Sequence, residues 1–147
     1  MPLPVNEPVR SYAPGSAERR SLKARLEAMA EAVVDIPMVV GGQDLRSETT
    51  VPVVMPHDHH HVLAHCHQAT PEVVRRAIDA AHIAHREWSA RPYSERAAVF
   101  LKAAELLAGS WRDTLNAATM LGQSKTAFQA EIDAACETVD FFRFNSA

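Results

Sequence analysis

One carboxylate near the end of the chain has the surroundings of a ligand-binding group. If residues 121–145 form a helix with about 100° per residue, Glu137 shares a face with alanines one and two turns before it and phenylalanines one and two turns after it, namely Ala130, Ala134, Phe141 and Phe144. An ionised carboxylate among apolar groups must pair with a cation, bind a proton or face water. Either Glu137 contacts a ligand, or it lies at the surface or pairs with a structural arginine.

The opposite face of this helix is predicted to be core. Its apolar residues follow the alternating spacing of a buried stripe, and they are Phe128, Ile132, Ala135, Val139 and Phe142. A helix that is apolar on both faces needs cover on both sides. We therefore expect more polypeptide to pack against it, and residues 16–147 to be incomplete as a domain.

Neither cysteine has the surroundings of a nucleophile. Cys66 falls in a predicted strand, and Cys136 falls in the middle of a helix without a nearby His or Lys in the sequence. Both are interpreted as small core residues, and their spacing indicates no disulfide. The sequence predicts no catalytic residue in this chain.

The glycines do not predict a nucleotide-binding loop. The chain has five, and they do not cluster into a G-x-G-x-x-G turn after a strand. The segment 122–126 has some likeness to a P-loop, but it lacks the upstream glycine and the preceding strand. We expect no cofactor-binding residue in this chain.

A histidine-rich segment suggests a metal site. Its histidines are His57, His59, His60, His61, His65 and His67. His65 and His67 would share one face of a strand, but the spacing matches no zinc signature, and a metal needs three or four ligands that converge on one point. We predict no metal ligand among them, and adventitious binding to nickel is favoured over a physiological site.

The order of helices and strands follows from caps, breakers and periodicity. Prolines favour an extended arm over residues 1–15. Helices are predicted at 16–34, 71–89, 94–109, 110–121 and 124–145, and β-hairpins at 38–46 and 49–67. Pro52 places its strand at a sheet edge or a bulge. The helix over 71–89 is predicted to be a core helix.

Several residues are predicted to cap these helices. Five helices are predicted to begin at Ser16, Thr70, Ser94, Ser110 and Ser124, with Asp113 completing a capping box after Ser110. Gly122 is predicted to end the fourth of them in a left-handed conformation.

Composition limits the class of protein. The 147 residues are 47% hydrophobic and 22% charged, with a net charge of -3, which is typical of a globular protein. Acids and bases are mixed, so we expect no nucleic-acid partner. No signal, transit or membrane segment is evident, and we expect a cytoplasmic protein without a membrane partner.

Four stretches carry a resemblance. The stretches are NEPV at 6–9, PMVVGGQ at 37–43, REWSARPYSERAAVFLKAAELL at 86–107 and GQSKTAFQAEIDAACETVDFFRFN at 122–145. They resemble the N-terminal region of the Δ1-pyrroline-5-carboxylate dehydrogenases, a branch of the aldehyde dehydrogenase superfamily. The resemblance implies an α/β aldehyde dehydrogenase-like fold. This chain would be its helix-rich N-terminal segment, with two short β-hairpins and without the Rossmann-type core.

The resemblance also implies a function. Members of this branch oxidise L-glutamate γ-semialdehyde to L-glutamate with NAD in proline degradation, and a Glu at the position of Glu137 lies near the amine end of the bound substrate. The nucleophile and the NAD site would lie in the remainder of the dehydrogenase polypeptide, so the 147 residues alone are predicted to be inactive. A homo-oligomer is expected.

Two other functions remain open from the sequence. The chain could be a non-catalytic helical interaction module whose aromatic face binds a partner or a second copy. It could also be a histidine-rich metal-binding protein.

Overall fold

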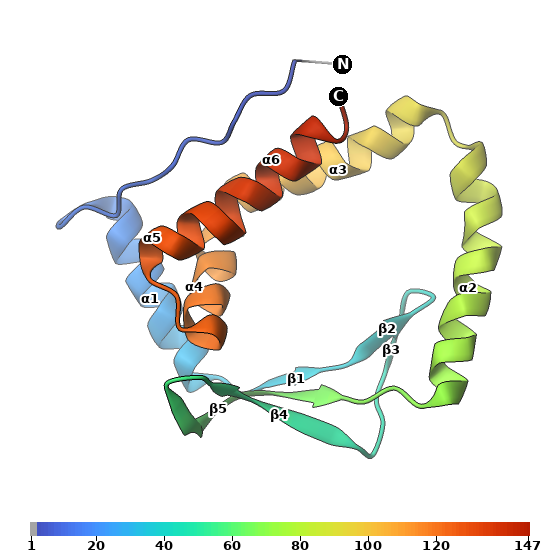
Figure 1. Ribbon diagram of the computed structural model, residues 1–147, viewed down its shortest axis with the longest axis horizontal. Helices are drawn as coiled ribbons and strands as arrows, with labels where there is room; N and C mark the ends of the chain where they lie inside the picture. Colours follow the sequence, from blue (N-terminus) through green and yellow to red (C-terminus); the bar gives the residue numbers. More distant parts are fainter. Residues whose placement is uncertain (1–2) are drawn as a thin grey trace.

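The computed structural model describes residues 3–147, which form an open arc of helices closed on one side by two small sheets (Figure 1). The helices are α1 (Ala17–Glu31), α2 (Pro71–Ala90), α3 (Tyr93–Ala108), α4 (Arg112–Gln123), α5 (Ala127–Ala130), the π-helical turn η1 (Glu131–Cys136) and α6 (Glu137–Phe144). The strands are β1 (Val34–Ile36), β2 (Met38–Val40), β3 (Gln43–Leu45), β4 (Thr50–Met55) and β5 (Asp58–His67).

The N-terminal arm is extended, as predicted, and runs beside the last helix (Figure 1). Residues 1 and 2 of the predicted arm lie outside the described residues. The arm ends in a turn at Gly15, and the Ser16 hydroxyl then accepts a hydrogen bond from the backbone N–H of Arg19, which confirms Ser16 as the helix cap. Helix α1 packs against α4.

The prediction that the first helix continues to residue 34 is wrong. Helix α1 ends at Glu31, because the β-branched residues that follow form β1. Val34–Ile36 pairs in parallel with Ala64, His65 and Cys66 of β5. This parallel pair joins distant parts of the chain, which local periodicity does not reveal.

Both predicted hairpins are present. Gly41 and Gly42 form the two-residue turn between β2 and β3, with φ values of 59° and 77° that favour glycine. The other sheet has the order β1-β5-β4, so Pro52 lies on an edge strand, as predicted. The histidine-rich segment is mostly strand, because β5 begins at Asp58 and contains five of its six histidines, all except His57.

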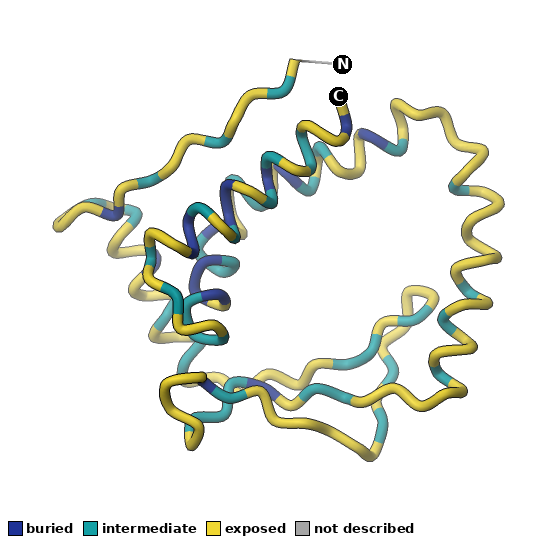
Figure 2. Tube along the Cα trace, viewed as in Figure 1, coloured by how far each residue is buried: buried dark blue, intermediate teal, exposed yellow. Residues whose placement is uncertain are grey.

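Helix α2 begins as predicted but is not a core helix within this chain. The Thr70 hydroxyl accepts from Val73 N–H, and Pro71 occupies the first turn. No residue of α2 is buried, and Val74 and Ile78 of its apolar stripe are 49% and 51% exposed (Figure 2). The helix contacts β2, and its apolar face is otherwise uncovered by residues 3–147.

Four of the predicted caps are wrong, and three of them concern α3 and α4. Helix α3 starts at Tyr93 after Pro92, and α4 starts at Arg112 after Trp111, and neither start has a side-chain cap, so Ser94 and Ser110 do not cap these helices. Gly122 lies inside α4, and Ser124 takes the left-handed conformation at its end instead, with φ of 54°.

The last helix starts later than Ser124 and contains a turn that the sequence did not predict. Thr126 and Gln129 form a capping box at the start of α5. The helix continues through the π-helical turn η1 into α6. Because periodicity was counted at 100° per residue throughout, the predicted core face is partly wrong: Ala135 and Val139 are fully buried, but Phe128 is 64% exposed.

The buried core lies where the arm, α1 and α4 meet. Tyr12, Leu22 and Ala117 form its centre, and Leu26 and Met120 are among the side chains packed around it. No helix within residues 3–147 is long and apolar enough to cross a membrane.

Candidate functional site

Glu137 is exposed at the first position of α6. The predicted apolar row around it is only half correct, because Ala130 is fully buried whereas Phe141 and Phe144 are 61% and 46% exposed. The π-helical turn separates the two halves of the row. Among residues 3–147, no cation forms an ion pair with Glu137. The carboxylate therefore faces solvent in this chain and is free to receive a group from outside it.

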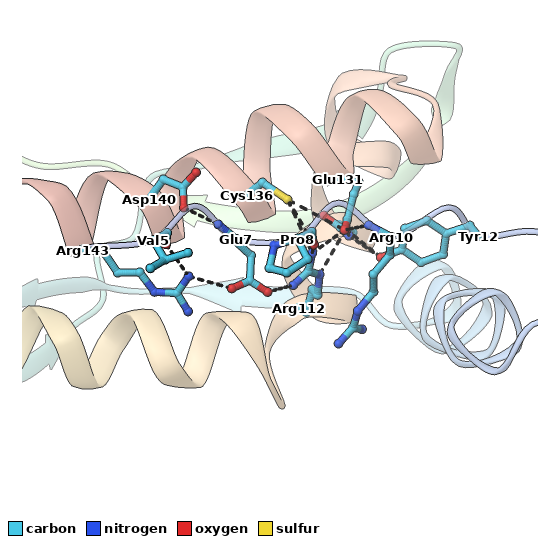
Figure 3. Close-up of polar contacts among 11 residues, drawn as sticks. Val5, Glu7, Pro8, Arg10, Tyr12, Arg112, Glu131, Cys136, Asp140 and Arg143 are labelled. Atoms are coloured by element: carbon cyan, nitrogen blue, oxygen red, sulfur yellow. Dashed lines mark hydrogen bonds and ion pairs between the residues drawn. The ribbon is translucent and has the colours of Figure 1, made fainter. Parts of the chain in front are cut away.

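A second carboxylate, which the sequence analysis did not single out, lies at the centre of a buried polar network (Figure 3). Glu131 is 0% exposed, and its two oxygens accept from Arg112 Nε at 3.2 Å, Arg10 N–H at 2.7 Å, Tyr12 OH at 2.8 Å and Asn116 Nδ2 at 2.8 Å. Arg112 Nη2 forms an additional ion pair with it. These donors come from the arm and from α4, so the network ties three separate segments together.

The charges in this network are fixed at neutral pH. Burial alone would raise the pKa of Glu131, but the hydrogen bonds from Arg112, Arg10, Tyr12 and Asn116 outweigh it and lower the pKa to about 2. Burial alone would lower the pKa of Arg112, but its bonds to carboxylates raise the pKa above its ordinary value. Burial and the adjacent Glu131 raise the pKa of Tyr12 to about 12. A saturated carboxylate of this kind is a structural anchor and has no capacity to accept a substrate proton.

A second cluster of ion pairs and hydrogen bonds continues the network along the arm. Glu7 bridges two arginines: it pairs with Arg112 Nη1 on one side and with Arg143 Nη1 at 2.8 Å on the other. Asp140 accepts from the backbone N–H of Glu7 and from Asn6 Nδ2, both at 2.7 Å. The side chains in Figure 3 lie in one row between the arm and the last helix. The arm is thus held to α6 by the ion pair of Glu7 with Arg143 and by the hydrogen bonds that Asp140 accepts.

Cys136 belongs to the same network. It is 5% exposed, and its Sγ lies 3.5 Å from Arg112 Nη2 and 3.9 Å from Glu131 Oε1. Burial and the charge of Glu131 raise the pKa of the thiol. A buried thiol with a raised pKa is a poor nucleophile, which agrees with the interpretation of Cys136 as a core residue. Cys66 is half-buried in β5, in the predicted strand.

The side chains of three histidines, His57, His61 and His67, form hydrogen bonds with other segments of the chain. His67 contacts Asp35 Oδ1 at 2.9 Å and the carbonyl oxygen of Ser47 at 2.7 Å, and His61 contacts the carbonyl oxygen of Ala30 at 2.7 Å. Within the described part of the chain, no three His, Cys, Asp or Glu side chains are placed to hold one metal ion.

Residues 43–147 match the aldehyde dehydrogenase family, and the chain belongs to that family. Its α/β fold is aldehyde dehydrogenase-like. Within the family, its relatives include the Δ1-pyrroline-5-carboxylate dehydrogenase of Agaricus bisporus, which is 47% identical over 98% of this chain and 27% of its own length. The mitochondrial enzyme of Homo sapiens is 43% identical over 97% of this chain and 25% of its own length.

Solved structures give the same match. The Δ-pyrroline-5-carboxylate dehydrogenase of Mycobacterium tuberculosis superposes with a TM-score of 0.97 at 49% identity, over 100% of this chain and 27% of that one. A further crystal structure of that enzyme is bound with NAD. The chain spans about a quarter of the length of the relatives that it matches.

Proposed function

We propose that these residues form part of an NAD-dependent dehydrogenase that oxidises L-glutamate γ-semialdehyde, the open form of pyrroline-5-carboxylate, to L-glutamate in proline degradation. The observation that carries this proposal is the match to the Mycobacterium tuberculosis enzyme over the whole chain, at 49% identity and a TM-score of 0.97. The nucleophile and the cofactor site are assigned to the remainder of the polypeptide.

The residues of this chain do not themselves fit NAD. A dinucleotide site needs a glycine-rich turn between a strand and the N-terminus of a helix. The only adjacent glycines, Gly41 and Gly42, form a hairpin turn between two antiparallel strands. NAD is proposed as the cofactor because crystal structures of a relative contain it.

Within this function, Glu137 contributes to the substrate pocket. The open semialdehyde carries an ammonium group next to its carboxylate, and an exposed carboxylate without a partner can form a charge-assisted hydrogen bond with it. The neighbouring Phe141 is 61% exposed and supplies an apolar wall one turn away. Glu137 binds the substrate in this proposal and takes no part in the covalent chemistry.

The exposed apolar faces are assigned to the rest of the polypeptide. Phe141 and Phe144 on α6 and the stripe on α2 lack cover within residues 3–147. Burial of one such phenylalanine contributes roughly 1.5 to 3 kcal/mol, so packing of the rest of the polypeptide against these faces would stabilise the enzyme.

A homo-oligomer is also proposed. The cytoplasmic location stays a prediction, since several relatives are mitochondrial enzymes.

The proposal is tested in the polypeptide that carries these residues together with the remainder of the dehydrogenase. NADH formation with pyrroline-5-carboxylate is followed at 340 nm for the parent, Glu137→Gln and Glu137→Ala. Both substitutions are expected to raise KM by about 10-fold or more, with a smaller effect on kcat, because the lost contact binds the substrate before the chemical step.

The matched control is Asp133→Asn, which removes another acid from the same helix and leaves Glu137 in place. Asp133 is 44% exposed and pairs with Lys125. This control is expected to keep the parent KM. An unchanged KM in Glu137→Gln would refute the pocket role, and a parent that forms no NADH from pyrroline-5-carboxylate would refute the function itself.

A further inference from the structure

Glu137, the proposed substrate-binding carboxylate, directly follows an unusual helical turn. In an α-helix, the N–H of Glu137 would donate to the carbonyl of Asp133, four residues back. It donates instead to the carbonyl of Ile132, five residues back. The turn from Glu131 to Cys136 is therefore π-helical, a geometry that is rare and occurs frequently at functional sites.

The buried network explains why this turn is wide. Residues five apart on an α-helix point about 140° away from each other. Glu131 and Cys136 are five apart, yet both are buried, their side chains lie 3.9 Å apart, and both contact the guanidinium of Arg112 (Figure 3). Only the wider turn allows both to face Arg112.

We propose that Glu131 is a positioning residue for substrate binding, because its bonds to Arg112 hold the π-helical turn that orients Glu137. This inference rests on the proposed function of Glu137. Glu131 is fully buried, so its side chain is not available to the substrate. Its effect on the pocket runs through the backbone of η1, whose last residue directly precedes Glu137.

The residues on both sides of the π-helical turn are held in place, so a structural change after loss of the Glu131 contacts falls on the turn itself. Upstream, the capping box of Thr126 and Gln129 fixes the start of α5. Downstream, Val139 is fully buried and Asp140 is tied to the arm. When the anchor at Glu131 is lost, neither end is free to move, so the turn itself changes shape. Glu137 lies at the junction of that turn with α6 and changes its direction with it.

The test is a double-mutant cycle in the full-length polypeptide, with Glu131→Gln made in the parent and in Glu137→Gln. In the parent background, we expect Glu131→Gln to raise KM for pyrroline-5-carboxylate by about 10-fold with a smaller change in kcat, because a displaced binding group loses its contact. In the Glu137→Gln background, the same substitution is expected to leave KM unchanged, since the group that it positions is already gone.

Three further measurements complete the test. Hydrogen exchange of the peptide that spans residues 131–141 is expected to be faster in Glu131→Gln than in the parent. Asp133→Asn, which removes an exposed acid from the same turn, is expected to change neither KM nor exchange. If Glu131→Gln does not fold, Tyr12→Phe replaces it, because it removes a single hydrogen bond from the Glu131 carboxylate. A smaller rise in KM, again absent in the Glu137→Gln background, is then expected.

The outcomes separate this inference from the function on which it rests. If Glu137→Gln alone leaves KM unchanged, the pocket role fails, and this inference fails with it. If Glu137→Gln raises KM but Glu131→Gln raises it equally in both backgrounds, or not at all, only the positioning role is refuted. An equal rise in both backgrounds is what a general loss of structure, or a direct field effect on the substrate, would give.

Discussion

Replacing Glu131 by Gln removes a charge that the fold stabilises, and the structure gives the size and the pH dependence of the loss. The pKa of Glu131 falls from an ordinary 4.5 to about 2 in the folded protein. This difference corresponds to about 3 kcal/mol of stability. Because the folded-state pKa is lowered, the contribution is complete above the unfolded value of 4.5 and is lost as the pH falls toward 2. At pH 7, Glu131→Gln should therefore be less stable by about 3 kcal/mol, and at pH 3 by only about 1 kcal/mol.

Thermal unfolding of the parent and the variant at a series of pH values between 7 and 3 measures this difference. The gap in Tm should be about 6 to 12 °C at neutral pH if the unfolding unit has about 150 residues, and it should narrow below pH 4.5. Asp133→Asn serves as control, because its ion pair with Lys125 is partly exposed and is worth at most about 1 kcal/mol. A gap that stays constant from pH 7 to pH 3 would show that the loss comes from packing and would refute the role of the charge.

Three further predictions concern the same region. Arg143→Ala should make the arm more sensitive to limited proteolysis, because Arg143 pairs with Glu7, whereas Lys102→Ala on the exposed surface of α3 should not. Cys136 should react with iodoacetamide at pH 8 more slowly than Cys66, because it is buried and the pKa of its thiol is raised; equal rates by peptide mass spectrometry would contradict its burial. Val139→Ala should lower the free energy of unfolding by about 1 to 3 kcal/mol, because Val139 is 0% exposed, and a change below 0.5 kcal/mol in a chemical denaturation experiment would count against this packing.

The sequence predicts the elements with strong local signals. Thr70 with Pro71 starts α2, and the glycine pair at 41 and 42 makes the first hairpin, because both signals act within a few residues. Pro52 places β4 at a sheet edge for the same reason. Ser124 and Thr126 are both plausible helix caps, and the helix starts after Thr126, which forms a capping box with Gln129.

Elements that depend on distant contacts could not be predicted. The pairing of Val34–Ile36 with β5 joins segments 30 residues apart, and the burial of Glu131 depends on Arg112 and on the arm. A helical wheel at a constant 100° per residue also does not detect a π-helical turn, because no residue type in the sequence indicates the one additional residue that such a turn contains. The i,i+5 spacing of Glu131 and Cys136 was the available signal, but it has meaning only once Arg112 is known to face them.

The structure tests the predicted surroundings of Glu137, whereas its role in the site stays a prediction. Glu137 is exposed, but Ala130, which the sequence predicts in the same row, is buried. The apolar stripe of α2 predicts a core helix, but no residue of this helix is buried within residues 3–147. Amphipathic periodicity indicates that one face of a helix is buried, but it does not identify the segment that covers this face.

The intact mass of the purified protein, measured together with NADH formation from pyrroline-5-carboxylate on the same sample, decides whether these residues act within a dehydrogenase. The proposal predicts a mass about four times the 16.2 kDa of these residues, as the 27% coverage of the relatives implies, and NAD-dependent activity. A protein of that mass without activity on pyrroline-5-carboxylate would contradict it, and so would an active protein of 16 kDa, since residues 3–147 do not fit an NAD site.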